Sequence, residues 1–345
     1  MQRKSSRVLL LLGALLVLAA CEGCYYGHLA VGQTRLLMAR EPMDEALARP
    51  DLDPKLRGQL ALVGEARKFA AELGLEVGKQ YTSYVDWPGD RVITTVVATE
   101  PGSAEAAGFR FPIIGEVPYK GFFDQERAKR EADSLRAEGM DVCVAAVPAY
   151  STLGWLADPV TTPMLQSSDG RLVQTVIHEL VHATVFVKSL PDFNEGVASF
   201  IGEEASVRFF GSRDAGEAAR QRARVDDDRA VAATLLRTRE RIARLYADEP
   251  ASPERDARRL AIDEEARAEL ASLPLTTHDA PRLAERVRLN DACLALRGAY
   301  RSETAVLDAV LDDLDGDLRA FIERLREAAQ SDDPRAAFLA GIPGP

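Results

Sequence analysis

The chain has 345 residues, of which 46% are hydrophobic and 28% charged, and it carries a formal net charge of −11 with a pI near 5.1. This length and composition allow one large or two modest globular domains with a sizeable apolar core. The acidic balance argues against nucleic acid as a partner, because proteins that bind nucleic acids need a basic surface.

The first twenty residues have the pattern of a secretory leader. Three basic residues, Arg3, Lys4 and Arg7, precede an apolar run of thirteen residues at 8–20. This run is too short to span a bilayer comfortably, but it suits the apolar core of a signal peptide. We therefore predict a signal peptide over residues 1–20 that is removed from the mature protein.

Cys21 follows Leu18-Ala19-Ala20 in a pattern that resembles the bacterial lipobox, in which the cysteine is lipidated and becomes the new N-terminus. Cleavage of an ordinary signal peptide beside an incidental cysteine is the alternative. Lipid on Cys21 would anchor the protein to a bacterial membrane through a tether over residues 21–27. Because Glu22 follows and not aspartate, nothing indicates retention at an inner membrane. We expect a cell-envelope protein at the outer membrane that faces the periplasm.

The other three cysteines, Cys24, Cys143 and Cys293, have no spacing typical of a zinc–cysteine site, and no disulfide framework is implied. Cys143 lies in an apolar run, so we expect it to be a small buried hydrophobic residue. A metal site would therefore take its ligands from other residue types.

Beyond the tether we expect a single domain over residues 28–341 and a tail over 342–345. The first part of this domain, residues 28–150, is predicted to hold a helical region and then strands. The helical pattern runs over about 28–75, and the predicted strands lie at 81–87, 91–99, 111–117 and 142–147. The first two strands are expected to form a hairpin around Pro88-Gly89-Asp90. Asp124 is expected to cap a helix over 125–137, which Gly139 ends.

The second part, residues 151–341, is predicted to be almost entirely helical. Helices are expected at 171–189, 195–209, 212–246, 254–272, 282–297, 303–312 and 316–329. The longest of these is expected to be solvated on one face and to pack Val225, Val231, Leu235, Ile242 and Leu245 inward. The predicted fold class is therefore α+β and mainly α-helical, with a small β-sheet and a helical C-terminal half.

An H-E-x-x-H motif, His178-Glu179-Leu180-Val181-His182, lies in an apolar run with helical periodicity. The chain contains only four histidines, and two of them fall in this motif. On a helix, His178 and His182 project one turn apart from the same face, so both can reach one ion. Glu179 is rotated away from them and can address a water bound to that ion. This is the geometry of a general base beside a Lewis acid.

Burial strengthens this interpretation, because two histidines and a glutamate on an apolar helix are costly without partners. One Zn²⁺ ion is the simplest compensation, and a buried ion-pair network without metal is the alternative. Catalytic zinc takes three protein ligands and leaves one position open. Glu195 is the expected third ligand, since a short turn and an antiparallel helix capped by Asn194 would return it to His182. An ordinary first-turn glutamate is the alternative reading of Glu195.

Other residues of the second helix are expected to support this arrangement. Gly196 and Ala198 are small and would permit close approach of the two helices. Glu203 and Glu204 are expected either to face solvent or to contact the ligand side chains on the side away from the metal.

The motif together with Asn194-Glu195-Gly196-Val197-Ala198 resembles the gluzincin metallopeptidases, in which two histidines and a glutamate hold zinc. The resemblance covers some thirty residues and implies His178, His182 and Glu195 as ligands, with Glu179 as the base. The twelve residues between His182 and Glu195 are fewer than in those families.

A broader resemblance, over most of the mature chain, is to a family of bacterial lipoproteins described as zinc aminopeptidases. It is carried by D-W-P-G-D at 86–90, F-P-I-I-G at 111–115, V-P-Y-K-G-F-F at 117–123, A-Y-S-T-L-G-W at 149–155 and F-N-E at 193–195. The resemblance implies aminopeptidase activity on a peptide substrate. However, the sequence lacks the G-x-M-E-N stretch with which alanyl-type aminopeptidases bind a free N-terminal amine, so metallopeptidase is the broader expectation.

Amide hydrolysis also needs a hydrogen-bond donor to the tetrahedral oxyanion. Tyr150, after the predicted strand at 142–147, and Tyr300, in the C-terminal helical region, are the candidates, with Tyr119 as a third. Each could instead be a core tyrosine whose hydroxyl is satisfied elsewhere. The predicted strand could pair with a peptide substrate by strand addition, or it could be fully buried.

We therefore expect a membrane-anchored zinc metallopeptidase with one zincin-like catalytic domain, in which Glu179 activates a zinc-bound water against a peptide bond. A non-catalytic cell-envelope lipoprotein with a structural metal is one alternative. A zinc hydrolase that acts on another amide or an ester is the other. The sequence leaves the oligomeric state open.

Overall fold

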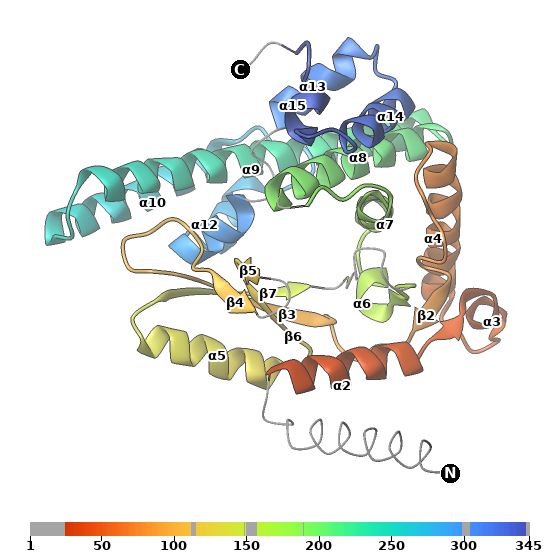
Figure 1. Cartoon of the computed structure of the whole chain (residues 1–345), viewed down its shortest axis with the longest axis horizontal. Helices are drawn as coiled ribbons and strands as arrows, with labels where there is room; N and C mark the ends of the chain where they lie inside the picture. Colours follow the sequence, from red (N-terminus) through yellow and green to blue (C-terminus); the bar gives the residue numbers. More distant parts are fainter. Residues whose placement is uncertain are drawn as a thin grey trace.

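The computed structural model describes residues 25–111, 115–147, 149, 157–188, 190–298 and 304–342. These residues contain 62% helix and 10% strand, which confirms the predicted α+β, mainly helical fold class. In the view of Figure 1, the long helices of the C-terminal half lie above the small sheets and the helices that cover them. None of the helices in these ranges is both long enough and apolar enough to cross a lipid bilayer.

The N-terminal part is helical as predicted, but it consists of three separate helices and a short strand. It contains α2 (Tyr25–Met38), the two-residue strand β1 (Glu41–Pro42), α3 (Met43–Ala48) and α4 (Pro54–Glu72). Asp53 fixes the start of α4, because its carboxylate accepts hydrogen bonds from the backbone N–H groups of Lys55 and Leu56. The apolar face of α4 packs against the helix that carries the H-E-x-x-H motif.

The strands form three small sheets. They are β2 (Ser83–Val85), β3 (Ile93–Thr99), β4 (Phe109–Phe111), β5 (Gly115–Val117), β6 (Lys120–Phe122), β7 (Asp141–Val147) and β8 (Val160–Thr161). The strand orders are β1-β2-β8, β6-β3-β7 and β4-β5. The hairpin predicted around residues 88–90 is therefore wrong. Trp87 and Val92, on either side of that turn, are buried with Leu36 of α2, so the turn carries the chain from one sheet to the next.

Two further predictions in this region have different outcomes. The single strand expected over 111–117 is wrong, since β4 and β5 are separate strands that pair antiparallel, with Phe109 opposite Val117. The helix α5 (Gln125–Ala137) has the predicted bounds. Asp124 caps it by accepting a hydrogen bond from the backbone N–H of Arg127, and Gly139 follows it with a φ of +88°.

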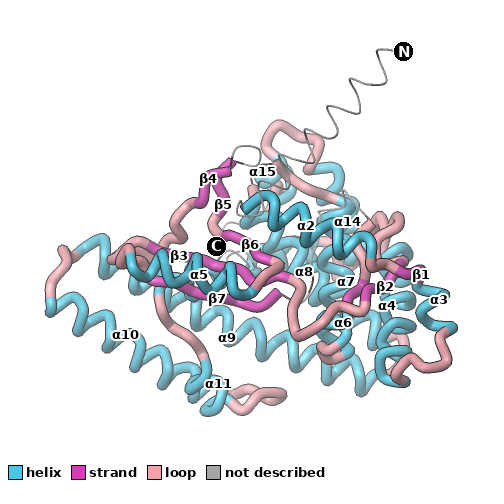
Figure 2. The backbone as a smooth tube through the Cα atoms, turned by 90° about the horizontal axis from the view of Figure 1, so that it is seen from below, coloured by secondary structure: helices cyan, strands magenta, loops and turns pink. Residues whose placement is uncertain are grey.

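The β6-β3-β7 sheet is covered on both faces. Val96 and Ala98 of β3 pack against α5, whereas Val97 between them faces α12 (Asp291–Gly298). Figure 2 shows α5 lying across β3 and β7. Among the described strands, β7 lies at the edge of this sheet, and it is buried only at Val142 and Cys143, so the expectation of a buried strand holds only for its first half.

A disulfide joins Cys143 of β7 to Cys293 of α12, which lie 150 positions apart in the sequence. The expectation that Cys143 is simply a buried hydrophobic residue is therefore wrong. Two cysteines at this separation carry no local signal, and only the packing of α12 against the sheet brings them together.

The second part of the chain is almost entirely helical, as predicted. Besides α12, it contains α6 (Thr162–Leu165), α7 (Asp169–Thr184), α8 (Pro191–Gly211), α9 (Ala215–Asp248), α10 (Pro253–Ser272), α11 (Ala280–Arg286), α13 (Thr304–Asp313), α14 (Leu318–Ala328) and α15 (Pro334–Phe338). Helix α9 is one long helix, and it buries four of the five predicted residues, Leu245 being half-buried. The helix predicted over 282–297 is divided into α11 and α12, because Asn290 is held by hydrogen bonds to Asp141 and Val142 of β7.

The largest core cluster surrounds α4, α7 and α8. The C-terminal helices close it from one side: Phe200 of α8 stacks on Phe321 of α14, and Phe338 of α15 packs edge-on against Phe321. The H-E-x-x-H helix therefore lies inside the main core, with its polar side chains at the core boundary.

Candidate metal centre

Helix α7 presents the motif histidines from a rigid support. Ser168 caps its N-terminus by accepting a hydrogen bond from the backbone N–H of Arg171. Its apolar residues are buried as predicted, among them Val173, Ile177 and Leu180. His178 and His182 project one turn apart from this buried helix, and their rings meet edge-on with centroids 4.8 Å apart.

The turn between α7 and α8 brings Glu195 back to the histidines. Helix α8 begins at Pro191, so the prediction that Asn194 caps a helix starting near Glu195 is wrong. Instead, the buried Asn194 clamps the turn: its Oδ1 accepts from Val187 N–H at 2.9 Å, and its Nδ2 donates to Val187 O at 2.8 Å. Glu195, the next residue, is thereby held at the start of the returning helix.

The two helices pack closely at Gly202 rather than at Gly196. A Cβ atom on Gly202 would lie 2.9 Å from the backbone oxygen of Gln174, whereas a Cβ on Gly196 would meet nothing within 4 Å. Ala198 is fully buried, as its small size suggested. The close approach therefore occurs two turns beyond the position expected from the sequence.

The ligand atoms of the three predicted residues converge. His178 Nε2 lies 3.1 Å from His182 Nε2 and 3.4 Å from Glu195 Oε2, and His182 Nε2 lies 3.5 Å from Glu195 Oε1. All three ligand atoms lie within 4.8 Å of one another. This triad can bind a metal ion.

Electrostatics within the triad favour a charged carboxylate. Burial alone would raise the pKa of Glu195, but hydrogen bonds and charge from His178 and His182 hold it at about 2. Burial would likewise lower the pKa of His178, yet Glu195 and Glu179 raise it above its ordinary value. The site is therefore one in which negative charge from carboxylates is concentrated around two imidazoles.

The far sides of the two rings are supported differently. Ser199 of α8 places its hydroxyl 3.5 Å from His178 Nδ1, at the limit of a hydrogen bond. His182 Nδ1 is buried and has no hydrogen-bond partner within the described ranges. Ser199 is one turn after Glu195, so one face of α8 contacts the site at two successive positions.

A sequence model of a family described as "Putative aminopeptidase" matches residues 24–339 of this chain. The chain belongs to this family. No curated protein and no solved structure matches the chain significantly. The description of this family suggests a peptidase of the aminopeptidase type, and it implies a peptide substrate.

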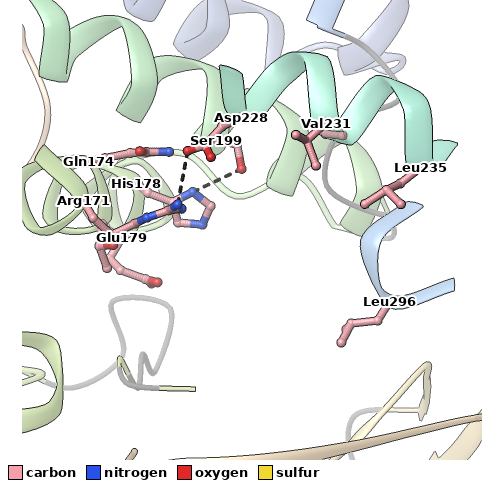
Figure 3. Close-up of a pocket in the computed structure, with 11 residues that line it drawn as sticks. Arg171, Gln174, His178, Glu179, Ser199, Asp228, Val231, Leu235 and Leu296 are labelled. Carbon is pink, nitrogen blue, oxygen red and sulfur yellow. Dashed lines mark hydrogen bonds and ion pairs between the residues drawn. The ribbon is translucent and has the colours of Figure 1, made fainter. Parts of the chain in front are cut away.

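In this member of the aminopeptidase family, Glu179 lies beside the triad at the wall of a cavity. The cavity has a volume of about 430 Å³ and is bounded by α7, α8, α9 and α12. His178 and Glu179 line it, and Figure 3 shows both side chains at its α7 side. The predicted base and one predicted ligand are therefore accessible from the same space.

Three tyrosines were candidates for the hydrogen-bond donor to the oxyanion. Tyr150 and Tyr300 lie outside the described residues. Tyr119, the third candidate, follows β5, and its pKa is raised by burial and then by the negative charges of Glu195 and Glu179. The residue as a whole is 44% exposed.

Tyr81 is a further unusual residue, and the sequence did not predict it. Its side chain is fully buried, its backbone adopts a φ of +56°, and burial together with the charge of Glu179 raises its pKa well above the ordinary value. A bulky residue with positive φ is strained, and such strain is concentrated at functional sites. No sequence signal marks this residue, because positive φ is expected at glycine or asparagine.

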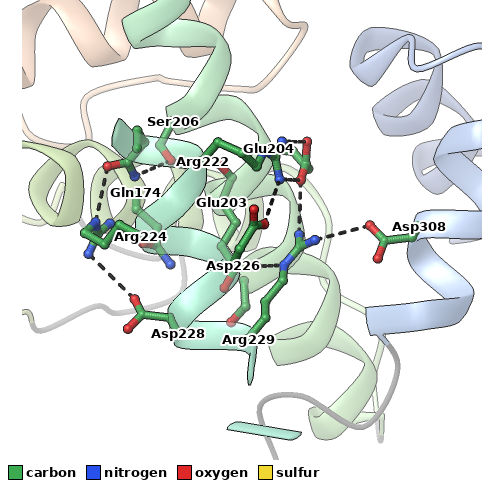
Figure 4. A network of polar contacts seen from close by, with 12 residues as sticks. Gln174, Glu203, Glu204, Ser206, Arg222, Arg224, Asp226, Asp228, Arg229 and Asp308 are labelled. Atoms are coloured by element: carbon green, nitrogen blue, oxygen red, sulfur yellow. Dashed lines mark hydrogen bonds and ion pairs between the residues drawn. The ribbon is translucent and has the colours of Figure 1, made fainter. Parts of the chain in front are cut away.

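Glu203 and Glu204 of α8 do not face solvent. Glu203 accepts a hydrogen bond from Arg229 of α9 at 2.7 Å, and Glu204 accepts from Arg222 at 2.6 and 2.7 Å. Figure 4 shows this network, which Arg229 extends to Asp308 on α13. Burial would raise the pKa of Glu204, but the hydrogen bonds from its arginine partners hold it at about 2. The expectation that they face solvent is therefore wrong, and the hydrogen bonds described here bind them to arginines.

Proposed function

We propose that the protein is a zinc-dependent metallopeptidase whose single zinc ion is held by His178, His182 and Glu195. The main support for this proposal is that the ligand atoms of these three residues converge. Zinc–ligand distances of about 2.0–2.2 Å place the ligand atoms of a tetrahedral site about 3.3–3.6 Å apart. The separations of 3.1, 3.4 and 3.5 Å lie in or close to this range. Two imidazoles and one carboxylate are also a donor set that catalytic zinc uses.

The number of ligands favours catalysis over a structural role. In the part of the chain that the structure describes, the group of possible ligands at this point has three members. Structural zinc sites are closed by four protein ligands, whereas catalytic sites leave a position for water and substrate. A non-catalytic lipoprotein with a structural metal is therefore the weaker alternative.

When bound, zinc would supply a Lewis acid that polarises the scissile carbonyl. Glu179 stands at the cavity wall beside His178, where it would accept the proton of the attacking water and transfer it to the leaving amine. Tyr119 would donate a hydrogen bond to the oxyanion. Ser199 would keep the His178 ring in the orientation that directs Nε2 to the metal.

Metal analysis of the purified protein tests this proposal. We expect about one zinc per chain in the wild type, and a large loss of zinc in His178→Ala and Glu195→Ala. Glu179→Gln should retain the metal but lower turnover of a peptide panel by about 10²- to 10⁴-fold, because it removes only the base. Zinc retained without turnover of any peptide would favour a structural metal or a different substrate. Turnover of esters or other amides by the same protein would then identify the second alternative.

We propose further that the protein is anchored in the cell envelope by lipid on Cys21, at the outer membrane and facing the periplasm. The Cys143–Cys293 disulfide supports an exported protein, because disulfides persist in oxidising compartments. Helix α2 begins four positions after Cys21 and lies on the outside of the described part of the chain (Figure 1). A Cys21→Ala protein should move from the membrane fraction to the soluble fraction. Its retention with membranes would contradict the lipid anchor.

A further inference from the structure

The cavity beside Glu179 has two chemically different walls. Figure 3 shows Val231, Leu235 and Leu296 on one side and Arg171 on the α7 side. Arg171 precedes His178 by two helical turns, so it marks the end of the cavity remote from the triad along α7. A substrate that occupies the cavity would thus place hydrocarbon against α9 and α12, and a polar group at Arg171.

The Arg171 guanidinium has spare hydrogen-bonding capacity. Its side chain is 46% exposed, and Nη2 contacts Asp228 at 3.1 Å. Within the described part of the chain, Asp228 is the only side chain to which the guanidinium donates a hydrogen bond. A guanidinium carries five N–H donors in a planar fork that matches a carboxylate. Most of these donors are therefore available to a ligand.

Asp228 does not neutralise Arg171 completely, because other donors share its carboxylate. Arg224 lies 3.7 Å and His278 Nε2 lies 3.3 Å from it. The only other acid that lines the cavity, among the described residues, is Glu179, which the proposed reaction uses as the base. A substrate ammonium would find no unshared carboxylate here, whereas a substrate carboxylate would find Arg171.

We propose that this cavity binds a carboxylate of the substrate at Arg171, and that the substrates are peptides with a carboxylate close to the scissile bond. The inference rests on the proposed peptidase function. Seven residues of helix place Arg171 about 10 Å along α7 from His178, which an extended peptide covers in about three residues. The carboxylate would therefore belong to an acidic side chain within about three residues of the cleaved bond, or to the C-terminus of a short peptide.

Two pairs of peptides distinguish these sources. The first pair differs only in glutamate or glutamine near the scissile bond, with an amidated C-terminus in both. The second pair lacks acidic side chains and differs only in a free or an amidated C-terminus. We expect the wild type to prefer the carboxylate member of one pair by about 10- to 100-fold in kcat/KM, since a charged hydrogen-bonded pair contributes that much. The pair that responds identifies the source.

Variants of the two ionic residues test the role of Arg171. Arg171→Gln should abolish the preference, and Arg171→Lys should retain part of it, because lysine keeps the charge without the fork. Asp228→Asn should strengthen the preference by removing the competing carboxylate. Arg136→Gln, a change at an exposed arginine that pairs with Asp133 on α5, is the matched control and should leave the preference unchanged.

The same peptide pairs should also be titrated calorimetrically into the Glu179→Gln protein. This measurement reports the preference as a ratio of Kd values without turnover, so it separates failure of the subsite from failure of the peptidase proposal. Absence of turnover by the wild type together with a Kd preference that Arg171→Gln removes would overturn only the peptidase proposal. Equal kcat/KM and equal Kd within both pairs, or an equal effect of Arg171→Gln on both members of each pair, would overturn the carboxylate subsite.

Discussion

Opening the Cys143–Cys293 disulfide is expected to destabilise the fold by an amount that follows from its position. The bond joins β7 to α12 across 150 positions of sequence. In the chain-entropy description, a cross-link that closes a loop of this length stabilises the native state by about 5 kcal/mol at 25 °C, and measured values for natural disulfides are about 2–5 kcal/mol. We therefore expect the double variant Cys143→Ser, Cys293→Ser to lose about 2–5 kcal/mol of unfolding free energy.

Equilibrium unfolding in urea, followed by circular dichroism, measures this difference. The oxidised wild type, the wild type treated with a phosphine reductant and the double variant should be compared at pH 7. Reductant should lower the midpoint of the wild type to that of the variant and leave the variant unchanged. Leu296 follows Cys293 by one turn of α12 and lines the cavity, so peptide turnover should also decrease in the double variant.

Two results would refute this reasoning. One is a difference below about 1 kcal/mol between oxidised and reduced protein, because the cross-link would then constrain the unfolded chain far less than its loop length requires. The other is an equal count of reactive thiols in denatured protein before and after reduction. Reduction of the disulfide should expose two additional thiols.

Three further predictions concern the site and its support. If the Tyr119 hydroxyl stabilises the oxyanion, Tyr119→Phe should lower kcat by about 10- to 10³-fold with little change in KM. Steady-state kinetics measure both constants, and an unchanged kcat would contradict this role. Asn194→Ala removes both hydrogen bonds of the α7–α8 clamp and should cost about 1–3 kcal/mol in urea unfolding, with weaker zinc binding because Glu195 is adjacent. The pKa of Glu204 is about 2 in the folded protein and 4.5 ordinarily, so its charge contributes stability above pH 4.5 that is lost as the pH falls towards 2. Glu204→Gln should remove about 3 kcal/mol of this acid sensitivity, and an unchanged dependence of unfolding free energy on pH would contradict that role.

The sequence predicted the parts of the site that depend on helical periodicity. His178 and His182 fall one turn apart on an apolar helix, and this spacing by itself determines that their rings share a face. Glu195 could be predicted because a short connection between two helices favours an antiparallel return. The start of α8 was misplaced because Asn194, a good capping residue, uses its side chain to bind Val187 across the turn instead.

What the sequence did not predict depends on contacts between distant segments. Residues 88–90 have turn chemistry, but the partner of a three-residue strand is decided by long-range pairing, and β2 finds β1 and β8. The disulfide and the positive φ of Tyr81 are equally non-local. Gly202 and Gly196 look alike in the sequence, and only the crossing of α7 and α8 decides which of them is in close contact.

The geometry of the triad is fixed by contacts with residues outside it. The clamp of Asn194 sets the turn, and Gly202 lets α8 approach Gln174 of α7. Two turns beyond Glu195 on α8, Glu203 is tied to Arg229 of α9 within a buried ionic network. Breaking a buried ion pair costs about 3–5 kcal/mol, so this network opposes any rotation of α8 that would turn Glu195 away from the histidines. The three side chains are therefore held in position by the fold, and the proposed metal ion would not have to order them first. For the same reason, substitutions at Arg229, which does not belong to the triad, should weaken metal affinity as well as stability.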